Sequence, residues 1–138
     1  MRPVLLATCF LLAANAAFAQ SAPVYKTQDC NKAVTQMDLN QCAGANYQSA
    51  DDTLNALYKQ VMLWLPDQAA KDRLRDSERA WIKHRDKVCA DEVGPQADGG
   101  SIWLMEMSNC LEKQTALRLR VLQKMNTCTA GVSVCNPH

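Results

Sequence analysis

Glycine, proline and histidine are scarce in this chain, and no long apolar run follows its N-terminal segment. The 138 residues include five glycines, five prolines and two histidines. Glycine and proline are the residues that a helix interior tolerates least, and runs of strand-favouring β-branched residues are few. We therefore expect an all-α fold, a small disulfide-stapled bundle of about three to four helices.

The chain also lacks an excess of charge. It has 15 basic and 14 acidic residues, and loss of the N-terminal segment with Arg2 would leave 14 of each. A net charge of zero attracts no nucleic acid and provides no overall field to steer a partner, and no polybasic cluster is present to hold anionic lipid. The apolar run 61–65 is too short for a membrane span, so we expect no stable membrane insertion of the mature chain.

Metal-binding patterns are missing as well. No Cys-x-x-Cys occurs, and the mature histidines, His84 and His138, lack zinc-type spacing from any cysteine pair. Met105 and Met107 lie two residues apart, so their sulfurs would diverge on a helix. A role in core packing is therefore favoured over copper binding. We expect no metal and no cofactor.

The N-terminal segment has the features of an export signal. Arg2 is followed by an apolar run over 4–12, and residues 17–19 form a small-x-small pattern. Signal peptidase needs small side chains at those two positions. Residues 1–19 are therefore predicted to be a signal peptide cleaved before Gln20, which places the mature protein in the bacterial periplasm or outside the cell.

Six cysteines remain after cleavage, and an even number in an oxidising compartment favours disulfides. They are Cys30, Cys42, Cys89, Cys110, Cys128 and Cys135. Six cysteines allow fifteen complete pairings, among which the sequence alone does not choose. The simplest proposal joins nearest neighbours, 30 with 42, 89 with 110 and 128 with 135.

Caps and apolar spacing divide the chain into elements. Residues 20–29 are expected to be a flexible leader, and a short helix is predicted over 32–43, ending near Gly44. A second helix, capped by Asn46 or Ser49, would end before Pro66.

A third helix is predicted over about 67–91, a loop follows it, and Ser101 would cap a fourth helix. The inner stripe of the third helix is expected to be Ala70, Leu74, Ser77, Trp81, His84 and Val88. The domain would cover 30–125, and 126–138 would form a short tail closed by a disulfide.

Three motifs in order resemble a known family. They are AD-x-x-LN-x-x-Y at 50–58, AWI-x-x-RD-x-x-C at 80–89, and GGS at 99–101 followed by Cys110, Thr115, Arg118 and Leu122. Over about 30–122 the chain resembles the LprI-like family of exported bacterial proteins, named for a lysozyme-inhibiting lipoprotein. The resemblance implies an all-helical periplasmic domain and suggests inhibition of lysozyme. Unlike the namesake, this chain is expected to be soluble rather than lipid-anchored.

We interpret the motif residues as the ones that dock the helices: Asp51, Leu54, Asn55, Tyr58, Trp81, Arg85, Asp86, Thr115 and Arg118. Asp51, Asn55 and Tyr58 share a helical face, and a buried network would pair Asp51 with Arg85 or Arg118 and Asn55 with a neighbouring backbone. A polar binding surface is the alternative. Arg85 would also lie over the indole of Trp81.

An enzyme is not expected. His84 and Asp86 lie about 200° apart around a helix, so they cannot form an acid–base pair, and His84 is expected at the margin of the core. The cysteines are expected to be oxidised, and no serine occupies a Gly-x-Ser-x-Gly turn.

The remaining candidate is the loop 91–101, which carries Asp91, Glu92 and Asp98 and no basic residue. Animal-type lysozymes are strongly cationic, so an acidic loop could be drawn to their cleft and block it. A solvated connector is the alternative. We predict a non-enzymatic binding protein that blocks lysozyme by stoichiometric contact. A second hypothesis is an envelope stress or scaffold protein that binds another periplasmic protein, and a third is a wall hydrolase.

Overall fold

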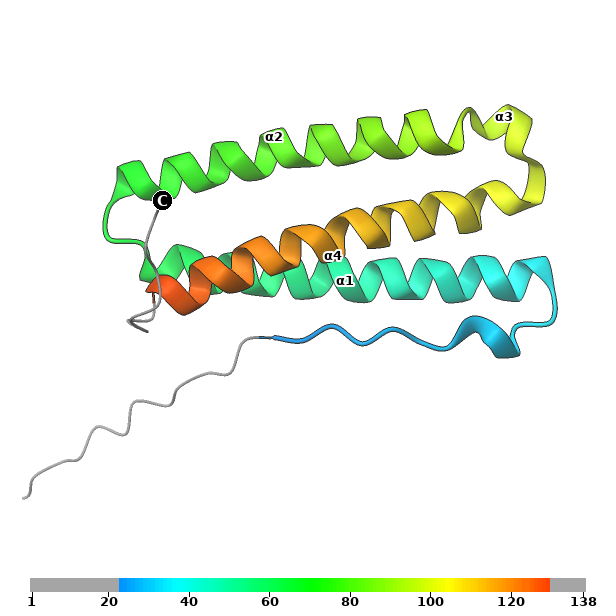
Figure 1. Ribbon diagram of the computed structural model, residues 1–138, viewed down its shortest axis with the longest axis horizontal. Helices are drawn as coiled ribbons and strands as arrows, with labels where there is room; N and C mark the ends of the chain where they lie inside the picture. The colour runs from blue at the N-terminus through cyan, green and yellow to red at the C-terminus, as the bar shows by residue number, and fades with distance from the viewer. Residues whose placement is uncertain (1–22, 130–138) are drawn as a thin grey trace, which may run out of the picture.

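The computed structural model describes residues 23–129, and every regular element there is helical (Figure 1). The predicted all-α fold is confirmed. Three long helices make the bundle: α1 (Gln36–Trp64), α2 (Gln68–Val93) and α4 (Trp103–Thr129). The short pieces are η1 (Cys30–Lys32), α3 (Gln96–Gly99) and η2 (Gly100–Ile102). The predicted signal peptide and Cys135 lie outside the described residues.

Helices α1 and α4 run in the same direction, and α2 runs opposite to both (Figure 1). The core is a cluster of buried leucine and valine side chains, to which α1 and α4 contribute most: Leu54, Leu57, Val61, Leu74, Leu119 and Leu122. Ala43 and Ala50 extend the buried stripe of α1 toward its N-terminus. Such small side chains allow α4 to approach α1 closely.

Helix α1 is one continuous helix, which corrects the prediction of two helices separated near Gly44. Its N-terminus has a capping box, in which Thr35 Oγ1 accepts from Asp38 N and Thr35 N donates to Asp38 Oδ2. A glycine inside a helix costs about 1 kcal/mol relative to alanine. Buried residues on both sides of Gly44, from Ala43 to Val61, outweigh that cost.

The boundaries of α2 follow from local chemistry. Leu65 is extended before Pro66, and Asp67 Oδ1 then accepts from Ala70 N at 2.7 Å and caps the helix. Gly94 ends α2 with φ 78° and ψ −174°, a conformation open almost only to glycine.

The connection from α2 to α4 is pinned by Trp103, whose Nε1 donates to Gly94 O at 2.9 Å. Gly99 leaves room for this indole, because a Cβ there would lie 2.7 Å from it. The sequence predicted that Ser101 caps α4, and this prediction is wrong. Ser101 lies in η2, and its carbonyl oxygen accepts from Asn40 Nδ2 at 2.9 Å.

Two predicted disulfides are confirmed, Cys30–Cys42 and Cys89–Cys110, with Cα–Cα distances of 5.8 and 5.6 Å. The third predicted pair involves Cys135, which lies outside the described residues. Cys89–Cys110 joins α2 to α4, and Cys30–Cys42 fastens η1 to α1.

The segment that precedes η1 has an extended backbone and lies against the bundle (Figure 1). Asn46 holds it, because its amide accepts from Gln28 N and donates to Gln28 O. Tyr25 OH donates to Glu112 on α4 at 3.3 Å. Asn46 therefore lies within α1 and binds this segment, instead of capping a helix as the sequence suggested.

Candidate functional site

A buried ion pair joins α2 to α4. Glu78 and Arg118 have side chains only 11% and 13% exposed. Arg118 donates to Glu78 Oε1 from Nε at 2.9 Å and from Nη2 at 2.6 Å, and Nη2 also donates to Ser77 Oγ at 2.8 Å. Neither charge is left alone, which is the condition under which a protein tolerates buried charges.

A second cluster joins α2 to α1 around Arg85, whose side chain is 10% exposed. Its Nη1 lies 3.5 Å from Asp51 Oδ1, its Nε donates to Asp86 Oδ1 at 2.8 Å, and its Nη2 lies 2.8 Å from the same oxygen. The guanidinium carbon lies 5.7 Å from the ring centre of Tyr47. Burial raises the pKa of Tyr47 above its ordinary value of 10.0, and the positive charge of Arg85 partly opposes this.

Trp81 connects the two clusters. Its ring lies 5.1 Å from the guanidinium carbon of Arg85 and 5.9 Å from that of Arg118, distances that allow cation–π attraction to both. We call Asp51, Glu78, Trp81, Arg85 and Arg118 the ionic layer. Since its charges are paired with one another, the layer sets how α2 sits on α1 and α4 and is not an open binding site.

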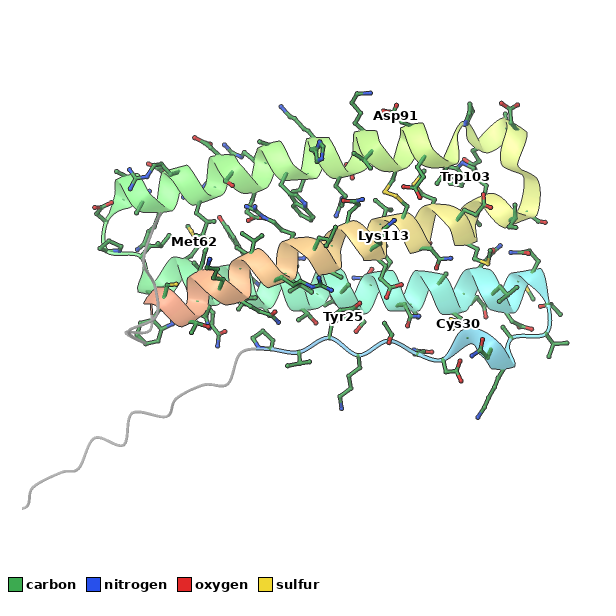
Figure 2. All side chains as sticks on the ribbon, in the orientation of Figure 1. Tyr25, Cys30, Met62, Asp91, Trp103 and Lys113 are labelled. Atoms are coloured by element: carbon green, nitrogen blue, oxygen red, sulfur yellow. A yellow bond between two sulfur atoms is a disulfide. The ribbon has the colours of Figure 1, made fainter. Side chains whose placement is uncertain are left out.

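The three predicted partner-binding acids lie at the end of the bundle where α2 turns into α4. Asp91 and Glu92 belong to the last turns of α2, and Asp98 belongs to α3. The prediction that they share a loop is therefore wrong. Asp91 lies on the side of α2 away from α4 (Figure 2), and its Oδ2 accepts from Lys87 Nζ at 2.7 Å.

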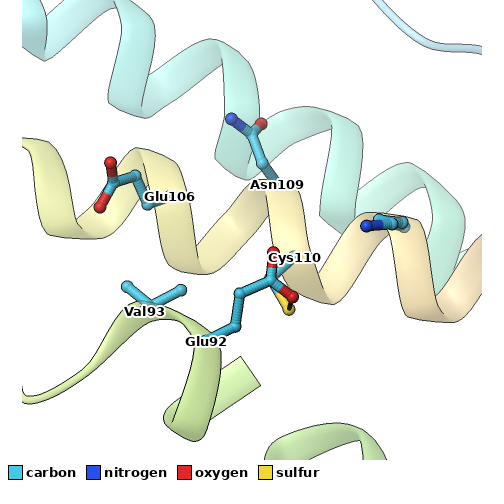
Figure 3. A pocket seen from close by; sticks show the side chains of 6 residues that line it. Glu92, Val93, Glu106, Asn109 and Cys110 are labelled. Carbon is cyan, nitrogen blue, oxygen red and sulfur yellow. Dashed lines mark hydrogen bonds between the residues drawn. The ribbon is translucent and has the colours of Figure 1, made fainter. Parts of the chain in front are cut away.

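Glu92 faces the opposite way and lines a pocket of about 320 Å³ between α2 and α4. The other lining residues are Val93, Glu106, Asn109, Cys110 and Lys113. Figure 3 shows Glu92 reaching from α2 toward Cys110, with Glu106 about one turn nearer the N-terminus of α4. Within residues 23–129, Glu92 forms no ion pair. Sequence reasoning missed Glu106, which the turn of the chain brings to the same pocket.

The pattern of charge along the chain explains why this end is acidic. Residues 88–112 contain five acids and no basic residue: Asp91, Glu92, Asp98, Glu106 and Glu112. Residues 113–129 contain four basic residues and no acid. The balanced net charge therefore hides a separation into an acidic end, defined here by Asp91, Glu92, Asp98 and Glu106, and a basic half of α4. Such a separation can orient an approaching partner even where the net charge is zero.

Comparison with known proteins shows the family to which this chain belongs. The model of the family described as "Lysozyme inhibitor LprI" matches residues 27–122. The chain belongs to the LprI family. A relative in Rhizobium meliloti (strain 1021), described as an uncharacterized protein, is 38% identical over 109 residues, which cover 70% of this chain and 78% of the relative. No solved structure matches.

The LprI motifs coincide with the ionic layer and the core beside it. The Asp51–Arg85 pair and the Arg85–Trp81 contact are present as expected. Asn55 differs from expectation: it is exposed and donates to Asp51 Oδ2 at 3.0 Å instead of bonding a backbone group. Other motif side chains are buried or partly buried in the bundle: Leu54, Tyr58 and Thr115.

The buried stripe of α2 was predicted correctly at Leu74 and at the partly buried Trp81, but its other buried members lie one residue later than predicted. It consists of Leu74, Glu78, Arg85 and Cys89, whereas the predicted stripe member His84 is exposed. The correct register could have been read from the predicted Cys89–Cys110 bridge, because a bridged Cys89 must face α4. Counting back by three and four residues from Cys89 leads through Arg85 and Trp81 to Glu78.

The described part of the LprI chain shows neither a metal site nor a spanning helix. Among residues 23–129, no three His, Cys, Asp or Glu side chains gather as a metal site would require. None of the helices in this range is long and apolar enough to cross a bilayer.

Proposed function

We propose that this LprI-family protein inhibits lysozyme by stoichiometric contact through the acidic end of the bundle, without chemistry of its own. Membership of a family described as lysozyme inhibitors supports the target. The acids of 88–112, of which only Asp91 forms an ion pair within residues 23–129, support the surface, because lysozymes of the animal type are strongly cationic and opposite charges steer and orient association. We further propose that this takes place in the periplasm or outside the cell, after removal of residues 1–19.

Glu92 is the observation that carries the choice of surface. A carboxylate in the last turn of a helix lies near the negative end of the helix dipole, where it is unfavourable. Asp91 is offset by Lys87, but Glu92 has no ion pair within the described residues and lies in a pocket that holds a second acid, Glu106, and one basic residue, Lys113. Helix stability therefore gives no reason for Glu92, whereas binding of a cationic group does.

The test is a lysis assay in which the purified, disulfide-bonded protein is titrated against lysozymes of several classes. We expect inhibition that saturates near equimolar ratio and weakens as salt is added. The variant Glu92→Gln/Glu106→Gln should lose at least tenfold in affinity. The matched variant Asp72→Asn/Asp76→Asn changes net charge equally at the other end of α2 and should inhibit like the parent.

Three results would contradict the proposal. No inhibition of any lysozyme at micromolar excess would remove lysozyme as the target, and recovery of a different periplasmic protein from extract would then favour the scaffold hypothesis. Equal loss in the two double variants would show that net charge, and not the acidic end, is responsible. Release of wall fragments by the protein alone would revive the hydrolase hypothesis.

A further inference from the structure

The C-terminal half of α4 carries cations that have no acidic partner. Arg118 is used in the ionic layer, where it pairs with Glu78. The other three, Lys113, Arg120 and Lys124, form no ion pair within residues 23–129. Their charges are thus available to a ligand.

Three cations of α2 are neutralised within their own helix. Arg75, Arg79 and Lys87 each pair with an aspartate three or four residues away on the same helix. Neutralisation of this kind leaves an ordinary solvated helix surface. Helix α2 has six acids for seven basic residues, whereas residues 113–129 of α4 have no acid for four basic residues. The shortage of acids is therefore a property of the second half of α4, although Arg73 and Lys83 of α2 also form no ion pair within residues 23–129.

The helical period collects the free cations with two apolar residues on one side of α4. Lys113, Leu117, Arg120, Val121 and Lys124 follow the spacing i, i+4, i+7, i+8 and i+11, and all five are exposed. Leu117 and Val121 are each 47% exposed. We call these five residues the basic face. It is about 17 Å long at 1.5 Å per residue, and Lys113 marks its start in Figure 2.

We propose that the basic face binds the surface of an anionic lipid bilayer, with α4 lying along the surface and no helix crossing it. A bilayer surface can meet all five side chains of a straight helix at once. Headgroup phosphates would take the three cations, and Leu117 and Val121 would enter the region just beneath them. An acidic protein would match the charges but would give the two apolar side chains no comparable environment.

The end of α1 adds to this argument. Helices α1 and α4 end at the same end of the bundle (Figure 1), and Leu63 and Trp64 there are 79% and 57% exposed. Tryptophan favours the boundary between lipid and water. The three cations form no polybasic run in the sequence because they are spread over twelve residues, 113–124, and only the helix brings them to one side. This binding does not depend on the proposed inhibition of lysozyme.

The experiment measures partition of the purified protein onto vesicles of phosphatidylglycerol and phosphatidylcholine, with pure phosphatidylcholine vesicles as the neutral arm. We expect binding to the anionic vesicles alone, reduced at high salt. Each basic residue near an anionic surface contributes about fivefold, so Arg120→Gln/Lys124→Gln should lower the partition coefficient roughly 25-fold. Leu117→Ser should lower it several-fold.

The matched control is Lys59→Gln/Lys83→Gln, which removes two exposed cations from α1 and α2. It should bind vesicles like the parent, and unchanged far-ultraviolet circular dichroism would show that every variant folds. The proposal is overturned if the parent fails to bind anionic vesicles at low salt or binds neutral ones equally. Equal losses in the two double variants, or full binding by Leu117→Ser, would also overturn it.

Discussion

Replacing Glu78 with leucine should destabilise the protein by about 3 kcal/mol, because it would strand the charge of Arg118. The guanidinium makes two of its three side-chain hydrogen bonds to Glu78 Oε1 and would keep only the one to Ser77. Breaking a buried pair by removing one partner costs about 3–5 kcal/mol. The lower end applies here, because both side chains keep slight contact with solvent.

The double variant Glu78→Leu/Arg118→Met separates the ion pair from the packing around it. Replacing both members of a buried pair with apolar groups of similar volume is often neutral or stabilising. We therefore expect the double variant to lie within about 1 kcal/mol of the parent, which implies a favourable coupling of at least about 2 kcal/mol between the two side chains.

The measurement is unfolding in urea under non-reducing conditions. A chain of this size has a slope of about 1.5 kcal/mol per molar urea, so the midpoint should fall by about 2 M in Glu78→Leu and return in the double variant. A loss below about 1 kcal/mol in the single variant, or a double variant as unstable as the two single changes added together, would refute this account of the ionic layer.

Two further predictions concern the backbone and pH. Gly94→Ala should cost about 1–3 kcal/mol in urea unfolding because of its positive φ, whereas Gly44→Ala should stabilise α1 by up to about 1 kcal/mol, and neither Cβ would meet an atom within 4 Å. Equal effects would contradict the backbone argument. The side-chain and backbone hydrogen bonds of Thr35 hold the pKa of Asp38 below its ordinary value of 3.8. The stability this carboxylate adds is present above pH 3.8 and is lost as pH falls through the lowered pKa. In thermal unfolding, Asp38→Asn should thus be less stable than the parent at pH 7 and equal to it at the lowest pH, and a gap that persists there would refute the sign.

The features predicted correctly from the sequence depend on short-range chemistry. Nearest-neighbour pairing held for Cys30–Cys42 and Cys89–Cys110, which close loops of only 12 and 21 residues. A covalent bond across a short loop restricts the chain in almost any fold that contains it. The end of α1 before Pro66 followed equally directly, because proline forces the preceding residue into extended backbone.

The features predicted wrongly depend on contacts between helices. Gly44 looked like a helix end, but the glycine penalty is small beside the packing of a buried stripe that continues on both sides of it. The segment 91–101 was predicted to be a loop because it contains glycines and a proline. The actual stop is set by Gly94 and reinforced by Trp103, a contact nine residues away that no local pattern shows.

The two long helices that flank the acidic end place their acids at opposite ends of the helix dipole. Helix α4 has Glu106 in its first turn, which is the stabilising arrangement for an acid. Helix α2 ends with Asp91 and Glu92 and has no basic residue in its last turn, which is the unfavourable one. Both arrangements place negative charge at the same end of the bundle, although only one of them stabilises its helix. Helix stability alone therefore cannot account for the acidic end, and the proposal that a cationic partner meets this end would account for both arrangements.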